Sequence, residues 1–301
     1  MTAGSDPRAG IKDILTDGKP VPTAFQVADY MKFYETPPSE RTDLQSTWYG
    51  RGQNFIVAYT VAEDGAVLEG PGQSDEYMVV LPDRETAAML TSGGEDHEIA
   101  GYTLTIVPPG ASSLAVRKGG VIVRIFSSQA PGLADLCLNR DTYATPDPNV
   151  APYAPWPAPR DGYRVRVYDL NIPPVAGRFG RIFQSSNLMV NVFYPQGPRD
   201  VTKMSPHHHD DFQQGWMILE GECVHHVRWP WTADLRIWRD DEHVRCGGPS
   251  LAVVPPPSLH TTQMTGERNV LLDIFSPPRT DFVEQGWVLN HDEYRLPEGG
   301  D

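Results

Sequence analysis

The sequence contains the stretch Pro206-His-His-His-Asp-Asp-Phe-Gln-Gln-Gly-Trp-Met-Ile-Leu-Glu-Gly221, which joins a histidine tract to an apolar run ending in a Glu-Gly turn. Side chains alternate between the faces of a strand, so His207 and His209 point to one side and His208 to the other. Gln214, on the paired strand before the turn, is placed to bring its amide oxygen beside the two imidazoles. This stretch therefore predicts a metal site built on facing strands.

The donors define the kind of metal that we expect. Imidazole and amide ligands suit one divalent transition metal, Fe(II), Mn(II), Co(II), Ni(II), Cu(II) or Zn(II), and the lack of a thiolate argues against a soft-metal or iron–sulfur site. Pro255-Pro-Pro-Ser-Leu-His260 follows a strongly β-type run and supplies His260 as the natural third imidazole. Gln213 is an alternative to Gln214, and three histidines binding the metal alone are a further alternative.

The chain outside these motifs consists of short β-type runs separated by Gly, Pro and Asp turns. They span residues 55–61, 77–81, 102–107, 121–126, 163–167, 188–194, 215–219, 223–227, 235–238, 251–254 and 270–275. The two halves repeat in register, because Thr105-Ile-Val-Pro-Pro-Gly110 matches Ala252-Val-Val-Pro-Pro-Pro257 and Ile125-Phe-Ser127 matches Ile274-Phe-Ser276. An internal repeat of this kind predicts two related all-β barrels.

Two segments mark the boundaries of these barrels. Residues 145–161 contain six prolines, which exclude a regular helix and indicate an extended connector. Residues 24–34 are typical of a short helix that stops before two prolines. We therefore predict an N-terminal arm at residues 1–45, a first barrel at 46–135, a Pro-rich linker at 136–170, a metal-binding second barrel at 171–290 and a C-terminal tail at 291–301.

The spacing of the second-half motifs resembles the cupin superfamily, whose first motif runs HxH, three or four residues, Glu, six residues, Gly and whose second runs PxGxxH. His207-x-His209, four residues, Gln214, six residues, Gly221 fits the first spacing, and Pro255-x-Pro257-x-x-His260 fits the second. The resemblance covers residues 46–290 and implies a bicupin, with two jelly-roll (double-stranded β-helix) barrels and a short N-terminal helical arm.

Three residues depart from the cupin pattern. Val201 stands where the family has a glycine, Gln214 replaces the usual Glu, and Pro257 replaces the motif glycine. A neutral Gln leaves the metal with its full positive charge, which favours an anionic substrate or an oxygen-derived anion.

The first barrel is expected to be a degenerate copy of the second. The cupin template places Glu69, Pro71, Glu76 and Ser113 at the ligand positions, where no imidazole remains. This predicts a role in packing or assembly. A hard-cation site formed by Glu69, Glu76 and Asp75 is the alternative.

Three further side chains are candidates for catalysis. His225 and His226 lie on the strand after the turn, and alternation brings only one of them inside, where it would act as a general base or contact a metal ligand. A purely structural role is the alternative for each of them. Arg228 is a catalytic candidate on the same strand, and it is one of four local cations for an anionic ligand, with Arg178, Arg181 and Arg236.

Composition limits the classes of partner. The net charge of −14 and the pI near 5.0 argue against nucleic acid and anionic membranes and favour a small-molecule substrate. Three cysteines without CxxC spacing fit a reducing cytoplasm. Neither a signal peptide nor a stretch of about 18 apolar residues is found. We expect a cytoplasmic protein and, since exposed sheet edges need covering, a homodimer.

The cupin resemblance and the three-histidine set favour an Fe(II) oxygenase of the dioxygenase type, acting on a small, aromatic or carboxylated substrate. A redox-neutral lyase or isomerase that uses Zn, Ni, Mn or Co is the first alternative, with His225 or His226 as proton carrier. A non-catalytic small-molecule binder is the second. Dependence on O₂ separates the first two classes.

Overall fold

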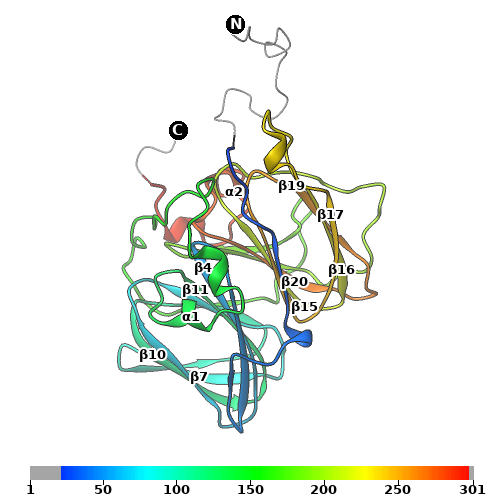
Figure 1. The fold of residues 1–301 in the computed structure, drawn as a ribbon. Coiled ribbons are helices and arrows are strands. Elements are labelled where there is room, and N and C mark those ends of the chain that lie inside the picture. The colour runs from blue at the N-terminus through cyan, green and yellow to red at the C-terminus, as the bar shows by residue number, and fades with distance from the viewer. Residues whose placement is uncertain (1–21, 298–301) are drawn as a thin grey trace, which may run out of the picture.

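The computed structural model describes residues 22–297, apart from the side chain of Pro71. Within this range the chain forms two antiparallel β-barrels that pack against each other (Figure 1). This confirms the predicted all-β fold of two barrels. The first 21 residues of the predicted arm and the last four of the predicted tail lie outside the described range.

The first barrel contains a seven-stranded sheet in the order β12-β9-β6-β11-β4-β3-β2 and a four-stranded sheet in the order β5-β10-β7-β8. The bounds of its strands are β2 Glu40–Arg41, β3 Gln45–Arg51, β4 Phe55–Ala62, β5 Val67–Gln73, β6 Tyr77–Leu81, β7 Ala87–Ser92, β8 Glu95–Ile99, β9 Thr103–Val107, β10 Gly110–Lys118, β11 Gly120–Ser127 and β12 Arg166–Asp169.

The second barrel contains a six-stranded sheet in the order β1-β18-β15-β20-β14-β13 and a three-stranded sheet in the order β17-β16-β19. Gly221 forms the predicted turn between β15 and β16 with a φ of 94°, a conformation that glycine adopts without strain. The bounds of the strands are β1 Asp29–Lys32, β13 Gly180–Gln184, β14 Met189–Phe193, β15 Gln214–Glu220, β16 Glu222–Arg228, β17 Glu242–Gly247, β18 Ser250–Val254, β19 Leu259–Met264 and β20 Val270–Phe275.

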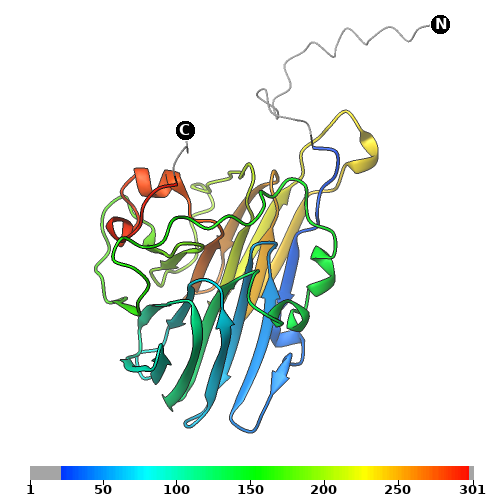
Figure 2. The same cartoon turned by 90° about the vertical axis from the view of Figure 1, so that its left-hand side faces the viewer.

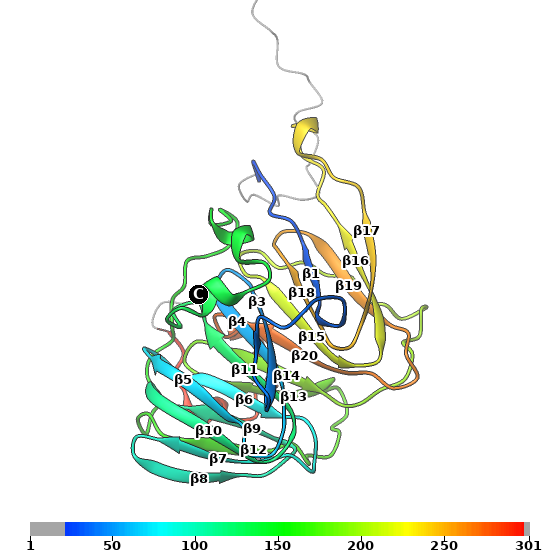
Figure 3. The same cartoon turned by 60° about the horizontal axis from the view of Figure 1, so that its bottom comes forward.

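The two barrels exchange edge strands. β1 pairs with β18 of the second barrel, beside which it lies in Figure 3, and β12 returns to pair with β9 of the first barrel. The predicted helix at residues 24–34 is therefore wrong, because Asp29–Lys32 is a strand. Tertiary pairing along an open sheet edge outweighed the local helical pattern. Figure 2 shows this N-terminal segment, in blue, running beside the yellow and orange strands.

Helical segments are short and lie in the connections. They are η2 Phe33–Glu35, α1 Leu133–Leu136, η3 Arg140–Tyr143, η4 Leu235–Ile237, α2 Thr280–Glu284 and η5 His291–Glu293. The strand predicted at 235–238 is wrong, since this segment is the turn η4, capped by the Asp234 side chain. Across residues 22–297, no helix combines the length and apolar character that a membrane crossing requires.

Alternation along the central strands gives the two large sheets two buried faces. In β4, Phe55, Val57 and Tyr59 pack into a core shared with the second barrel, while Ile56 and Ala58 point into the first barrel. β15 is built the same way: Met217 joins the shared core, and Trp216 and Ile218 point into the second barrel. Every second residue of β15, beginning with Gln214, therefore lines the interior of the second barrel.

Candidate metal centre

A short backbone bridge aligns the first and last of the predicted histidines. His207 and His260 face each other, with reciprocal N–H to carbonyl hydrogen bonds of 3.0 and 2.8 Å. His260 belongs to β19, whereas His207 lies in a loop that has only this one bridge. The bridge places the two imidazoles side by side, with ring centroids 4.7 Å apart.

The three predicted imidazoles converge on one point. One ligand nitrogen from each of His207, His209 and His260 lies within 4.8 Å of the others. His209 and His260 are buried and His207 is exposed, so the cluster opens to solvent on the His207 side. Within residues 22–297, no other group of three or more His, Cys, Asp or Glu side chains meets in this way.

Hydrogen bonds fix which ring nitrogens are free. The Nδ1 atoms of His207 and His260 each donate to a backbone carbonyl, of Ser205 and Ser258 respectively, at 2.9 Å. Their Nε2 atoms therefore carry the lone pairs. Orientation of an imidazole by a hydrogen bond at its other nitrogen is typical of metal ligands.

The Gln214 amide oxygen lies among these nitrogens, 2.8 Å from His209 Nε2 and 3.2 Å from His260 Nε2. Gln213 points the other way, where its oxygen accepts from the Gln53 N–H and its amide donates to the Tyr143 hydroxyl. Alternation along the strand thus decides between the two glutamines. Gln214 is the one that offers a fourth donor.

The buried imidazoles are held in the neutral form that binds a metal. Burial lowers the pKa of His209 to about 3, and the hydrogen bond with Gln214 only partly opposes this. Burial also lowers the pKa of His260 well below its usual value, with neighbouring His209 and His207 acting in the same direction. Three imidazoles and an amide oxygen fit a divalent transition metal.

Arg279, which the sequence reasoning missed, lies at the edge of this cluster. Its Nη1 is 3.4 Å from His209 Nδ1, and its side chain is 16% exposed. The guanidinium also forms a two-point ion pair with Asp281 and packs over the rings of Phe212 and Phe282. A cation thus stands beside the three imidazoles in aromatic surroundings, an arrangement suited to a carboxylate ligand.

A buried acid lies behind Gln214 and was also missed. Asp273, on β20, is directly opposite Trp216 and Asn191 on the two neighbouring strands and is 4% exposed. Burial raises the pKa of Asp273 to about 7, and hydrogen bonds from Gln214 and Asn191 act against this rise. Its position one residue before the repeated Ile-Phe-Ser triplet was the available sequence signal.

His225 is the inward-facing histidine of β16, as alternation requires. It is fully buried, its Nδ1 is 3.0 Å from the Thr262 hydroxyl, and its Nε2 is 3.4 Å from Cys223 Sγ. Burial lowers its pKa to about 3. Its ring stacks on Trp216, which also contacts His260 edge-on. His225 therefore lies behind Trp216 rather than beside the cluster.

Strand alternation places His226 and Arg228 away from the predicted metal ligands. Both point outward, because strand alternation that turns His225 inward turns these two residues to the opposite face. Arg228 is 68% exposed and forms a two-point ion pair with Asp241. His226 contacts His243 on the surface.

Glu76 and Ser113, two of the predicted first-barrel positions, are wrong by one residue, which turns them to the other face of the strand. Tyr77 packs on Phe126 in the first barrel, and Gln214 lies opposite the matching Phe275 in the second, so Tyr77 corresponds to Gln214. The Tyr77 hydroxyl is 2.9 Å from the hydroxyl of Ser112. This contact takes the place of the one between Gln214 and His260. The first barrel thus has a tyrosine–serine pair where the second has donors.

The predicted acidic alternative in the first barrel does not form a cation site. Glu76 is bound outside the barrel interior by Arg166, the Ser186 N–H and the Tyr294 hydroxyl. Its neighbour Asp75 accepts from the hydroxyls of Ser127 and Tyr153. These carboxylates join separate segments of the fold instead of converging.

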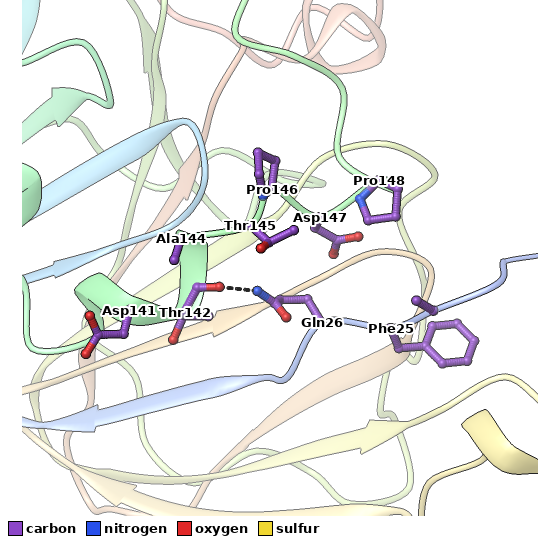
Figure 4. A pocket seen from close by; sticks show the side chains of 10 residues that line it. Phe25, Gln26, Asp141, Thr142, Ala144, Thr145, Pro146, Asp147 and Pro148 are labelled. Carbon is purple, nitrogen blue, oxygen red and sulfur yellow. Dashed lines mark hydrogen bonds between the residues drawn. The ribbon is translucent and has the colours of Figure 1, made fainter.

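A hollow of about 260 Å³ lies away from the histidines, between residues 24–26 and 141–148 (Figure 4). The Gln26 amide crosses it and donates to the Thr142 carbonyl. Asp141 and Asp147 line it, and no Lys, Arg or His does. It contributes nothing to the metal centre.

Comparison with known proteins identifies the architecture. No family model and no curated protein matches the sequence. Among solved structures, the chain is similar to the Lactobacillus farciminis oxalate decarboxylase formate complex, with 13% identity, a TM-score of 0.58 and coverage of 83% of this chain and 86% of that one.

Two further structures agree. A variant of Bacillus subtilis oxalate decarboxylase has 12% identity and a TM-score of 0.55, with 88% of this chain and 84% of that chain covered. The Momordica charantia 7S globulin has 13% identity and a TM-score of 0.52, with 84% of each chain covered. Identities this low establish the fold alone. The chain shares the two-barrel fold of these three structures, which is the fold that the cupin resemblance implies.

Proposed function

We propose that the protein is a metal-dependent enzyme that acts on a small carboxylate-bearing substrate as a redox-neutral lyase or isomerase. The observation that carries this proposal is the position of Arg279, whose Nη1 lies 3.4 Å from the Nδ1 of His209. A fixed guanidinium next to a metal-binding cluster selects for an anion that contacts both.

The metal would be held by His207, His209 and His260, with Gln214 as the fourth donor. All four are neutral, so the centre keeps the charge of its ion and favours an anionic ligand. A divalent ion bound here would act as a Lewis acid that polarises a substrate oxygen. Fe(II), Mn(II), Co(II), Ni(II), Zn(II) and Cu(II) all suit these donors.

Arg279 would bind and orient the substrate carboxylate. Asp281 already occupies one side of its guanidinium, and Nη1 faces the Nδ1 of His209, while the Nε2 of this ring faces Gln214. Phe212, Phe275 and Phe282 surround the group and exclude water, which strengthens its interaction with an anion. His225 is not used as the proton carrier, because Trp216 packs between this ring and the cluster.

An Fe(II) dioxygenase is the second candidate. It is favoured by the neutral set of three imidazoles and by the aromatic wall beside His209, where Phe212 stacks at 4.4 Å between ring centroids. This wall suits an aromatic carboxylate as well as an aliphatic one. The two candidates share the metal site and Arg279, and they differ in their requirement for O₂.

The test is turnover of a panel of small 2-oxo, hydroxy, dicarboxylic and phenolic acids by protein loaded with Mn, Fe, Co or Zn, with and without O₂. We expect turnover without O₂. Arg279→Gln should lower kcat/KM on the order of 100-fold with metal content unchanged, since a charged hydrogen bond to the substrate is lost. Arg279→Lys keeps the positive charge but lacks the paired donors of the guanidinium, so its kcat/KM should lie between those of wild type and Arg279→Gln.

Arg228→Gln is the matched control, because it removes an outward-facing arginine of the same barrel and should leave kcat/KM unchanged. Turnover that requires O₂ would reject the lyase or isomerase proposal in favour of the dioxygenase. Equal kcat/KM in Arg279→Gln and wild type would reject Arg279 as the substrate-binding cation.

A further inference from the structure

A pair of histidines lies on the outer wall of the second barrel, which β16, β17 and β19 form (Figure 1). His226 on β16 is directly opposite His243 on β17. Directly opposed residues of antiparallel strands project from the same face, with Cβ atoms about 4.5–5.5 Å apart. The Nδ1 atoms of these two rings are 2.7 Å apart, and the ring centroids are 4.9 Å apart.

The surrounding hydrogen bonds direct a lone pair into the gap between the rings. The Nε2 of His226 lies 3.3 Å from the amide oxygen of Gln263, an acceptor, so Nε2 carries the proton and Nδ1 is free. His226 Nδ1 therefore accepts a hydrogen bond from His243 Nδ1. A metal ion would take the place of this proton, which would move to the Nε2 of the exposed His243. An imidazole fixed through its other nitrogen by an amide oxygen is how metal ligands are usually oriented.

The charges on this face do not oppose a cation. Arg228 is neutralised by Asp241, and Arg245 by Glu222, in exposed ion pairs of 2.6 and 3.1 Å. On the other side of His226, the directly opposite residue on β19 is Thr261, which is 8% exposed. The Thr261 hydroxyl is buried and has no hydrogen-bond partner among residues 22–297.

We propose that His226 and His243 form a second metal site, through their Nδ1 atoms, for an ion of intermediate softness such as Cu(II), Ni(II) or Zn(II). Two imidazoles without thiolate or carboxylate suit these ions, and water completes the coordination. The site is separate from the inner centre, because His226 and Thr261 face outward while His260, the residue before Thr261, faces inward.

The test uses Cu(II) alone on the full chain purified without a histidine tag, with calorimetry for stoichiometry and electron paramagnetic resonance for the bound nitrogens. A variant with His207→Ala, His209→Ala and His260→Ala removes all three inner imidazoles, so this background isolates the outer site. It should still bind about one Cu(II) with two nitrogen ligands. Adding His226→Ala or His243→Ala should weaken this binding on the order of 10- to 100-fold and leave one nitrogen.

His97→Ala in the same background is the matched control, because His97 lies on β8 of the first barrel beside Glu95 and should leave Cu(II) binding unchanged. Unfolding of the copper-free variants verifies that the barrel stays intact. Unchanged affinity and unchanged nitrogen count in both His226→Ala and His243→Ala would overturn the proposal. Because the inner site is absent from this background, that result would leave the proposed enzyme function standing.

Discussion

The two barrels share a strand order and differ in what they place at the centre. In the second, the Gln214 oxygen lies 3.2 Å from His260 Nε2, and two further imidazoles join them. In the first, the corresponding contact is a hydrogen bond of 2.9 Å between the hydroxyls of Tyr77 and Ser112. The barrel fold therefore supplies only backbone positions that point inward, and the few side chains at those positions decide whether a metal binds.

A charge reversal accompanies this difference. Arg124 and Asp273 stand one residue before the matching triplets 125–127 and 274–276, and both are 4% exposed. Asp273 lies behind the Gln214 amide, whereas Arg124 donates to the backbone carbonyl of Glu69 at 2.9 Å. At this one position the barrel with metal donors has a buried acid, and the barrel without them has a buried cation.

The largest effect is expected from removing one imidazole, which should leave the second barrel, like the first, without bound metal. His260→Ala is expected to abolish metal retention, lowering affinity by more than the 10- to 100-fold typical of losing a group behind the ligands. Elemental analysis of protein purified without a tag measures this. His208→Ala is the control, since His208 is exposed and adjacent to the site. Equal metal content in His260→Ala and wild type would contradict the site assignment.

Neutralising the buried acid should have the next largest effect, seen in the metal-free protein. The pKa of Asp273 is raised from 3.8 to about 7, so the folded state binds this proton more tightly than the unfolded state. Its stabilising contribution is complete below pH 3.8 and is lost as the pH rises to about 7. The difference between these two pKa values corresponds to up to roughly 4 kcal/mol of unfolding free energy.

Asp273→Asn should remove this pH dependence. Urea unfolding of wild type and variant at pH 5 and pH 8 provides the measurement, and the difference between the proteins cancels the contribution of the buried histidines. Asp240→Asn, at an exposed carboxylate of the same barrel, is the control. A difference in unfolding free energy that is the same at both pH values would show that burial does not raise this pKa.

The smallest effect is expected in the first barrel. Tyr77→Phe removes the hydrogen bond to Ser112 and should cost about 1 kcal/mol of unfolding free energy. Metal content should stay at the wild-type level, because this residue is in the barrel without donors. Urea unfolding and elemental analysis measure the two quantities. Loss of metal in Tyr77→Phe would mean that the first barrel influences metal binding in the second, contrary to this expectation.

Most strands followed from the sequence because their apolar residues are local and periodic. The runs at 77–81 and 270–275 match β6 and β20 residue for residue. The prediction at 24–34 did not hold, because β1 owes its conformation to its partner β18 and not to its own residues. The turn at 235–238 was likewise mistaken for a strand, since four apolar and basic residues do not distinguish the two.

The candidate site likewise contains residues that the sequence predicted and residues that only the structure could place. Spacing alone predicted that His207, His209 and His260 belong together, since alternation and a matched motif need no knowledge of distant contacts. The choice of Gln214 over Gln213 needed the strand to be placed, because a shift of one residue reverses the face. The same uncertainty of register misplaced the template on the first barrel, where Glu76 was named in place of Tyr77.

By itself, the sequence determined the all-β class, the two-barrel repeat and the three converging histidines, because each depends on periodicity or spacing within short segments or on the repetition of such segments. The tertiary structure alone decided that Arg279 and Asp273 adjoin the cluster, that Trp216 separates His225 from it, and that His226 meets His243. Those contacts lie between separate strands and loops, and only the folding of the sheets brings them together.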